Sequence, residues 1–315
     1  AVVMADRRVA GSLPRVWACS EYVATACLRY PEDLDFLLGD AGVNAPWTPE
    51  SLEPASDAEL DEAALMRRLR ILRRRETLRV AWRDLAGWST LDESLGHLSE
   101  LACVCIRQAV DGAHRRLVGR FGEPLDRDGL PQRLLVLGMG KLGGGELNFS
   151  SDIDLVFLFP RAGQTDGPRA TTNDQFFTRL GQAVIRILDQ ATADGFVYRV
   201  DMRLRPFGDS GPLCVSLSAF EDYLQQHGRS WERYAYVKAR PITGHADGMG
   251  LYADILRPFV YRRYLDYGVF ESLRRMKHRI EAEGQQGAAR DDVKRGAGGI
   301  REIEFVTQCF QILQG

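Results

Sequence analysis

The sequence has few cysteines, no long apolar run and little net charge, and each shortage excludes a class of protein. Six cysteines among 315 residues are too sparse for a disulfide framework. The five histidines have no partners at zinc-ligand spacing. The longest apolar runs, at residues 134–137 and 155–159, are far too short to span a bilayer. A net charge of -2 argues against a protein that coats nucleic acid. We therefore expect a cytoplasmic protein with no membrane or nucleic-acid partner.

The hydrophobic pattern divides the chain into three parts. Helical spacing dominates first, at residues 13–28, at residues 57–86 with Ser56 as N-cap, and from Thr90 to Arg120. Strand patterns follow at residues 134–137, 152–159 and 196–205, with a helix over 173–192. The remainder is again helical, with a loop at residues 285–292 and helices over residues 218–226, 231–240, 251–283 and 300–313.

This division predicts a mostly helical α+β protein. The expected parts are an N-terminal helical region at 1–130, an α/β core at 131–215 and a C-terminal helical region at 216–315. The chain begins without Met and stops directly after a predicted helix, which indicates a piece of a longer protein. Six arginines lie between residues 67 and 75. They predict a solvated or acid-paired helix face, with a docking surface for an acidic partner as the alternative.

Gly138, Gly140 and Gly143 follow a predicted strand in the Gly-x-Gly-x-x-Gly spacing of dinucleotide-binding turns. That fold needs a helix after the third glycine and an acid after the second strand. Here residues 144–151 lead directly into the next strand, and Asp152 opens it. A dinucleotide-binding domain is therefore not expected.

Asp152 and Asp154 stand two residues apart at the start of an apolar strand. Side chains at i and i+2 of a strand project from one face, so the two carboxylates would lie together. Adjacent like charges need a counter-ion, and Mg²⁺ prefers oxygen ligands. The glycine-rich turn at residues 140–145 would let backbone amides approach phosphates without a Cβ in the way. The pattern favours phosphoryl chemistry over two solvated acids.

Arg199, Asp201, Arg203 and Arg205 alternate with apolar residues along the predicted strand 196–205 and would share one face. One acid among three arginines is typical either of a buried ion-pair lattice or of a metal ligand flanked by phosphate-binding groups. Because an acid pair opens the preceding strand, we favour the second interpretation. Asp201 would then complete a carboxylate triad.

Five strings carry a family resemblance. They are GMGKLGGGELNFSSDIDL at 138–155, GFVYRVDMRLRPFG at 195–208, WERY at 231–234, VKAR at 237–240 and GAGGIREIEF at 296–305. The first two resemble the polymerase-β-like nucleotidyltransferase superfamily, which uses three carboxylates and two Mg²⁺ ions. All five together are similar to the bifunctional glutamine synthetase adenylyltransferase/adenylyl-removing enzymes. The resemblance covers almost the whole chain and is weakest before residue 130.

The resemblance implies a polymerase-β-like nucleotidyltransferase core with helical flanks, and a second nucleotidyltransferase half in the same polypeptide. The GGGELNFSS and REIEF strings are similar to the N-terminal, adenylyl-removing half. In the family that half removes AMP from a tyrosine of glutamine synthetase, with inorganic phosphate as attacking group and ADP as product. A PII-type signal protein is the other partner that the resemblance implies.

Roles follow at the matching positions. The resemblance implies that Asp152, Asp154 and Asp201 are catalytic and hold two Mg²⁺ ions at the α-phosphate of the tyrosyl-AMP. The turn, two serines and several basic side chains are expected to bind the nucleotide or phosphate: Gly140, Lys141, Gly143, Gly144, Ser150, Ser151, Arg203, Arg205, Lys238 and Arg240. Of these, Lys238 and Arg240 are expected on the helix over 231–240. No general base is required, because phosphate arrives ionised.

Two questions stay open from the sequence. Glu302 and Glu304 follow two glycines at the start of the last predicted helix, where acids serve as caps, so their roles are either structural or functional. The reaction could also run forward, as ATP-dependent adenylylation of the same tyrosine. A non-catalytic regulatory module is a third reading, and its expected mark would be the loss of a carboxylate.

Overall fold

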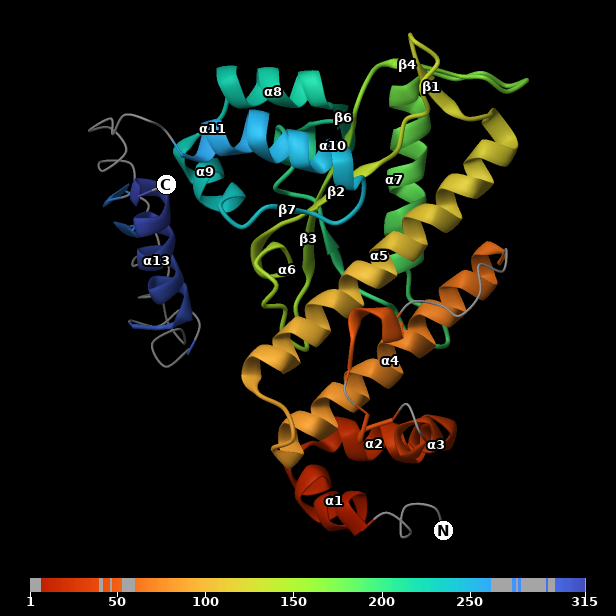
Figure 1. The fold of residues 1–315 in the computed structure, drawn as a ribbon, viewed down its shortest axis with the longest axis vertical. Coiled ribbons are helices and arrows are strands. Elements are labelled where there is room, and N and C mark those ends of the chain that lie inside the picture. The colour runs from red at the N-terminus through yellow and green to blue at the C-terminus, as the bar shows by residue number, and fades with distance from the viewer. Residues whose placement is uncertain are drawn as a thin grey trace.

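The computed structural model describes residues 7–39, 42–45, 47–52, 60–261, 274–275, 277–278, 293 and 298–314. Helices occupy both ends of the chain, and a small mixed sheet lies between them (Figure 1). The predicted α+β class, mostly helical with helical flanks, is therefore confirmed. Among the described residues, no helix is both long and apolar enough to cross a membrane.

Short helices begin the described chain: α1 (Arg7–Cys19), α2 (Glu21–Arg29), α3 (Pro31–Leu38) and the 3₁₀ turn η2 (Pro49–Leu52). The single helix predicted over residues 13–28 is wrong, because the chain breaks at Ser20. The Ser20 backbone is extended, and its hydroxyl accepts a hydrogen bond from the Val23 N–H at 3.3 Å. That bond caps α2 and so starts a new helix.

Two long helices follow, α4 (Glu62–Ala86) and α5 (Leu91–Phe121). Asp61 caps α4, and the predicted cap at Ser56 lies outside the described residues. Thr90 caps α5 as predicted, in a reciprocal capping box with Glu93.

Several arginines of α4 form contacts inside the protein. Arg74 and Arg75 both donate to Asp33 of α3, whose side chain is fully buried. Arg70 is 1% exposed and donates to the carbonyl oxygens of Ile187, Gln190 and Gly195, and burial lowers the pKa of its guanidinium. The acid-paired interpretation is therefore confirmed for Arg74 and Arg75, which tie α4 to α3.

The central sheet has the strand order β5-β3-β2-β7, and β6 also pairs with β3. Its strands are β2 (Leu135–Gly138), β3 (Ile153–Phe159), β5 (Val200–Asp201), β6 (Cys214–Ser216) and β7 (Arg240–Pro241). β3 runs parallel to β5 and β6, whereas β2 is antiparallel to β3 and β7. A separate two-stranded antiparallel sheet consists of β1 (Pro124–Asp126) and β4 (Gly163–Thr165).

Both faces of the sheet are buried. Leu155, Phe157 and Phe159 of β3 pack in one core with α5 and with α7 (Asn173–Asp189). Val156 and Leu158 pack in a second core with α8 (Leu217–Gln226) and α9 (Ser230–Tyr236). Burial on both sides explains why the strand reads as a continuous apolar run. The alternation places Asp154 on the face of Val156 and Leu158.

The strand predicted over residues 196–205 is much too long. The N–H groups of Val197 and Tyr198 both donate to the carbonyl of Leu188 at the end of α7, so pairing begins only near Val200. After Asp201 the chain turns, with the Arg203 N–H donating to the Asp201 carboxylate at 2.9 Å. A side-chain acceptor thus competes with the sheet and ends the strand.

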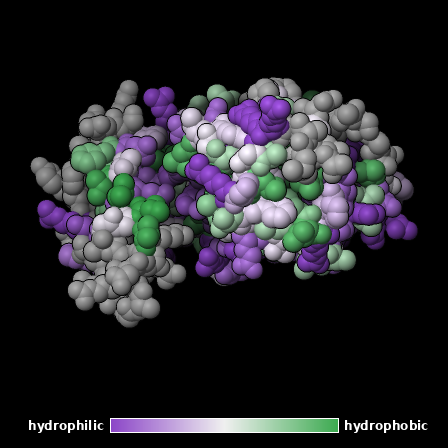
Figure 2. All heavy atoms as spheres, turned by 90° about the horizontal axis from the view of Figure 1, so that it is seen from below, coloured by the Kyte–Doolittle hydropathy of each residue, from purple (hydrophilic) through white to green (hydrophobic). Residues whose placement is uncertain are grey.

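The C-terminal region is also divided more finely than predicted. The prediction that Lys238 and Arg240 lie on a helix is wrong, because α9 ends at Tyr236. Arg240 belongs to β7 and pairs with Gly138 of β2. Then come α10 (His245–Gly250), the π-helical stretch η4 (Leu251–Leu256), α11 (Arg257–Val260), and later α13 (Ile300–Gln314). The predicted loop at 285–292 lies outside the described residues. Apolar side chains are exposed on α13, at the left in Figure 2: Ile300, Ile303, Val306 and Phe310.

Candidate active site at the start of strands β3 and β5

Parallel pairing of two short strand segments brings the predicted carboxylates together. In the register of β3 and β5, Asp154 lies opposite Asp201. Neighbouring strands lie about 4.8 Å apart and in-register side chains share a face, so these two carboxylates are adjacent. Asp152 stands just before β3 and is exposed at the same edge. Sequence spacing predicted the first acid pair, and the pairing of distant segments adds Asp201.

The glycine-rich turn begins directly over Asp154. Gly140 has a φ of 52°, and a Cβ on it would lie 3.1 Å from Oδ2 of Asp154. The Met139 N–H donates to the carbonyl of Asp154 at 2.9 Å. Glycine is needed here both for the left-handed backbone and for the close approach to the carboxylate.

The later residues of the turn form backbone hydrogen bonds with its earlier residues. The N–H groups of Gly143, Gly144 and Gly145 donate to the carbonyls of Met139, Gly140 and Leu142 at 3.0, 3.0 and 3.2 Å. These bonds form the short helix α6 (Gly140–Gly143). The turn is therefore held in place by its own backbone hydrogen bonds.

Arg240 donates hydrogen bonds to the turn, and the backbone of Lys238 packs closely against it. Arg240 donates from Nε to the carbonyl of Gly143 and from Nη2 to that of Leu142, both at 3.2 Å. A Cβ on Gly143 would lie 2.0 Å from the Lys238 carbonyl oxygen and 2.4 Å from that of Gly138. The turn is therefore packed, backbone to backbone, between the end of β2 at Gly138 and the segment at Lys238 that leads into β7.

Gly143→Ala should lower turnover about tenfold or more, because backbone atoms on both sides would have to move and carry the turn away from Asp154. The matched control is Gly119→Ala in α5, where an added Cβ meets nothing within 4 Å. That variant should keep full activity and be as stable as the parent or more so. Steady-state kinetics and thermal melts of both variants test the expectation, which equal activity in Gly143→Ala would contradict.

The arginines of the predicted basic face each hold a neighbouring group. Arg199 donates to Asp152 at 2.5 Å, and both side chains are exposed. Arg203 donates from Nε and Nη2 to Asp201 at 2.8 and 2.5 Å. Donation by Arg203 lowers the pKa of Asp201 against the opposing effect of burial, so this carboxylate stays ionised at neutral pH.

Arg205 differs from Arg203 in its surroundings. Its side chain is 13% exposed, donates from Nη1 to the Met202 carbonyl at 2.8 Å and pairs with Asp209 at 3.3 Å. The Arg203 side chain is 76% exposed. Arg205 thus braces the turn after β5, whereas Arg203 projects from it beside Asp201.

The carboxylates suit a divalent cation in their chemistry, although arginines engage two of them here. Asp154 and Asp201 supply adjacent oxygen donors, and Asp152 adds a third at the same edge, a donor set that hard cations prefer. Within the described residues, no three such side chains already stand in a metal-binding arrangement. Each carboxylate has two oxygens with several lone pairs, so Asp152 and Asp201 can coordinate a cation beside their arginine partners or in exchange for them.

The remaining predicted binding residues lie close by along the chain. Lys141 is half-buried in α6. Ser150 and Ser151 lie between α6 and β3, where the Ser151 hydroxyl donates to the Asn148 side chain. The sequence placed Arg199 on the predicted basic face but did not reveal its pairing with Asp152, and it gave no role to Glu146, which contacts Lys238. Only the fold reveals these contacts, since no spacing rule joins residues 47 and 92 positions apart.

The structure separates the two acids of the last helix. Glu302 accepts from the Gly298 N–H at 2.8 Å and so acts as a cap at the start of α13. Glu304 instead lies 3.4 Å from Nζ of Lys238. Glu302 thus has a structural role, whereas Glu304 contacts Lys238, which packs against the glycine-rich turn.

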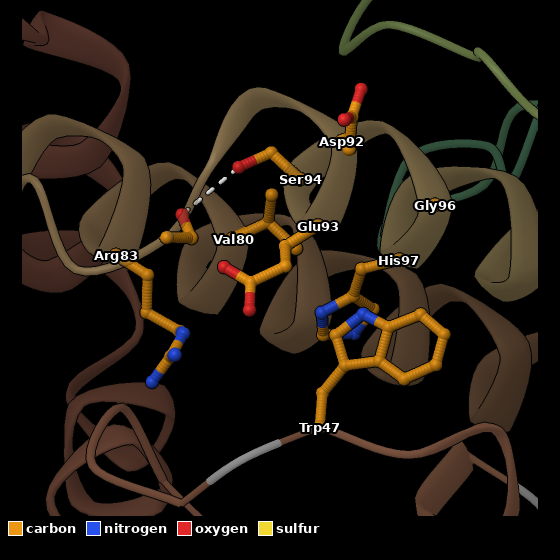
Figure 3. A pocket seen from close by; sticks show the side chains of 9 residues that line it. Trp47, Val80, Arg83, Asp92, Glu93, Ser94, Gly96 and His97 are labelled. Carbon is orange, nitrogen blue, oxygen red and sulfur yellow. Dashed lines mark hydrogen bonds between the residues drawn. The ribbon is translucent and has the colours of Figure 1, made fainter.

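A cavity in the described part of the chain lies away from these residues. It measures about 310 Å³ and is formed between Trp47, α4 and the start of α5, with Arg83, Glu93 and His97 in its wall (Figure 3). Ser89 and Ser94 are hydrogen-bonded to each other at its edge, at 3.0 Å. His97 is buried against Glu76, and burial lowers its pKa despite that carboxylate. None of the predicted site residues lines this cavity.

Comparison with known proteins decides the family. A family model described as glutamate-ammonia ligase adenylyltransferase matches residues 10–250. The chain belongs to this family. The resemblance carried by the sequence strings is thereby confirmed at the family level. A second model, described as GlnD PII-uridylyltransferase, matches residues 273–315, which include α13.

A curated relative extends the comparison. The chain is similar to the bifunctional glutamine synthetase adenylyltransferase/adenylyl-removing enzyme of Thioalkalivibrio sulfidiphilus (strain HL-EbGR7), with 52% identity over 307 residues. These residues make up 96% of this chain but 32% of the relative. The chain therefore spans about a third of the length of the curated relative that it matches.

Proposed function

We propose that this site removes AMP from an adenylylated tyrosine of glutamine synthetase by phosphorolysis. The observation that carries the proposal is the adjacent pair Asp154 and Asp201 beneath the turn that starts at Gly140. The family and the name of the relative support glutamine synthetase as the target protein. In the reaction, a phosphate oxygen forms a bond to the α-phosphorus and the bond to the tyrosine oxygen breaks. The attacking hydrogen phosphate loses its proton as the phenolate gains one, which gives ADP and unmodified tyrosine.

Mg²⁺ would be held by Asp152, Asp154 and Asp201. When bound, two such ions stabilise the attacking and leaving oxygens of an in-line displacement and neutralise developing charge. The ionised state of Asp201, favoured by Arg203, suits this role. Removal of divalent cations with a chelator is expected to stop turnover, and adding back Mg²⁺ should restore it.

The protein's own groups would bind and orient the two anions. Lys141 and the glycine backbone around it suit the AMP phosphate, because they follow directly after Met139, whose N–H donates to the Asp154 carbonyl. Arg203 is the exposed guanidinium beside Asp201 and suits the attacking phosphate, whose oxygens its planar fork matches. Holding both anions in line before reaction is where most of the catalytic effect is expected.

The direction of the reaction rests on the sequence strings. GGGELNFSS at 143–151 and REIEF at 301–305 are similar to the adenylyl-removing half of the family's bifunctional enzymes. The same similarity supports a second nucleotidyltransferase half and a PII-type signal protein as partners. Carboxylates at all three predicted positions argue against a non-catalytic module.

The deciding experiment gives the protein the substrates of each reaction in separate assays and measures which reaction it catalyses. Adenylylated glutamine synthetase with phosphate and Mg²⁺ should yield ADP and unmodified tyrosine, detected by chromatography and intact-protein mass. Unmodified glutamine synthetase with ATP should remain unmodified. Transfer of AMP in the second assay without ADP release in the first would establish the forward reaction instead. Inactivity in both assays would favour the regulatory module.

A further inference from the structure

Lys238 joins the C-terminal helix to the glycine-rich turn. Its Nζ contacts Oε1 of Glu146, at the end of that turn, and lies 3.4 Å from Oε1 of Glu304 in α13. The three side chains are 19, 40 and 33% exposed for Lys238, Glu146 and Glu304, so the contacts are partly screened from water. One ammonium group is therefore shared between two segments that are far apart in sequence.

Lys238 also touches the turn without using its charge. Its Cδ lies 3.2 Å from the position that a Gly144 Cβ would occupy, and its carbonyl oxygen packs on Gly143. The carboxylate of Glu146 lies 3.0 Å from the same Gly144 position. A shift of the Lys238 side chain must therefore move atoms that pack on the turn.

α13 is fixed to the same neighbourhood by an apolar contact. Phe305 is 6% exposed, and its ring centroid lies 5.6 Å from that of Tyr234 in α9. Burial, with a smaller effect of Glu304, raises the pKa of the Tyr234 hydroxyl, so this contact stays uncharged. Phe305 places the helix, and Glu304 one residue earlier contacts Lys238.

We propose that Lys238 is a positioning residue for the glycine-rich turn and that Glu304 sets its position, so that α13 controls how firmly the turn is held over Asp154. The proposal rests on the proposed function, since it assigns a means of regulating that same site. Displacement of α13 would break the contact between Glu304 and Lys238, and Lys238 would then pair with Glu146 alone. A looser turn would bind the nucleotide phosphate less well.

The test is Glu304→Gln in the complete protein, with Glu302→Gln as its matched control. Both variants lose one negative charge from the same helix, but Glu302 caps Gly298 and does not contact Lys238 in the structure. Hydrogen exchange measured by mass spectrometry without substrate should be faster in peptides covering residues 140–147 of Glu304→Gln only. The Kd for Mg-ADP should rise on the order of two- to fivefold, as expected for a partly exposed ion pair. Melting temperatures should stay close to that of the parent.

A double-mutant cycle with Lys238→Met shows whether Glu304 acts through Lys238. In the Lys238→Met background, Glu304→Gln should have no further effect on exchange or on the Kd. Equal effects in both backgrounds, unchanged exchange at 140–147, or the same change in Glu302→Gln would each overturn the proposal. Exchange is measured without turnover, so these outcomes stand apart from failure of the phosphorolysis assay.

Discussion

Asp154→Asn should lower AMP removal about a thousandfold, because stabilisation of the displaced charge by a bound cation is worth several kcal/mol. Asp154 lies opposite Asp201 and against Gly140, so its carboxylate is the central donor of the site. An amide has no charge to offer a cation. The fold should persist, since removing one of two adjacent like charges relieves repulsion. Phosphorolysis rates and thermal melts measured with and without Mg²⁺ test both parts.

Two further variants complete this test. Asp152→Asn should also abolish turnover if the acid before β3 belongs to the same donor set. Asp222→Asn removes a similar charge from an exposed position on α8 and should leave the rate unchanged. Near-parental turnover by both Asp152→Asn and Asp154→Asn would remove the catalytic assignment.

Arg205→Met should destabilise the protein by about 2–3 kcal/mol, since it removes a charge-assisted hydrogen bond from a side chain that is largely shielded from water. The 13% exposed Arg205 donates to the Met202 carbonyl and pairs with Asp209, and these contacts hold the turn after β5. Chemical denaturation measures the free energy of unfolding. If Arg205→Met fails to fold, Arg205→Lys should also lower the free energy of unfolding, but by a smaller amount.

Arg203→Lys should show the opposite pattern. Its 76% exposed side chain contributes little to the fold, so the melting temperature should hardly change. The apparent phosphate requirement should rise about tenfold, because an ammonium group lacks the planar fork of a guanidinium. Arg161→Lys, an exposed arginine paired with Asp126 beside the separate β1 and β4 pair, is the matched control. A large stability loss with an unchanged phosphate requirement would favour an ion-pair lattice around Asp201.

Local rules in the sequence determined several elements correctly. Thr90 and Glu93 start α5 in a capping box, because such a cap depends only on residues three positions apart. The spacing of Asp152 and Asp154 at the start of an apolar strand likewise depends only on neighbouring residues, and it indicated the candidate site. Boundaries failed where a competing local group intervened, as at Ser20 and at the turn after Asp201.

Only the tertiary structure decided which distant groups meet. Pairing of β3 with β5 sets Asp201 beside Asp154, although 47 positions separate them. The same folding places Arg199 beside Asp152 and Lys238 between Glu146 and Glu304. A residue's chemistry and local spacing are written in the sequence. Its partners depend on strand register and helix packing, which arise from burial of apolar surface across the whole chain.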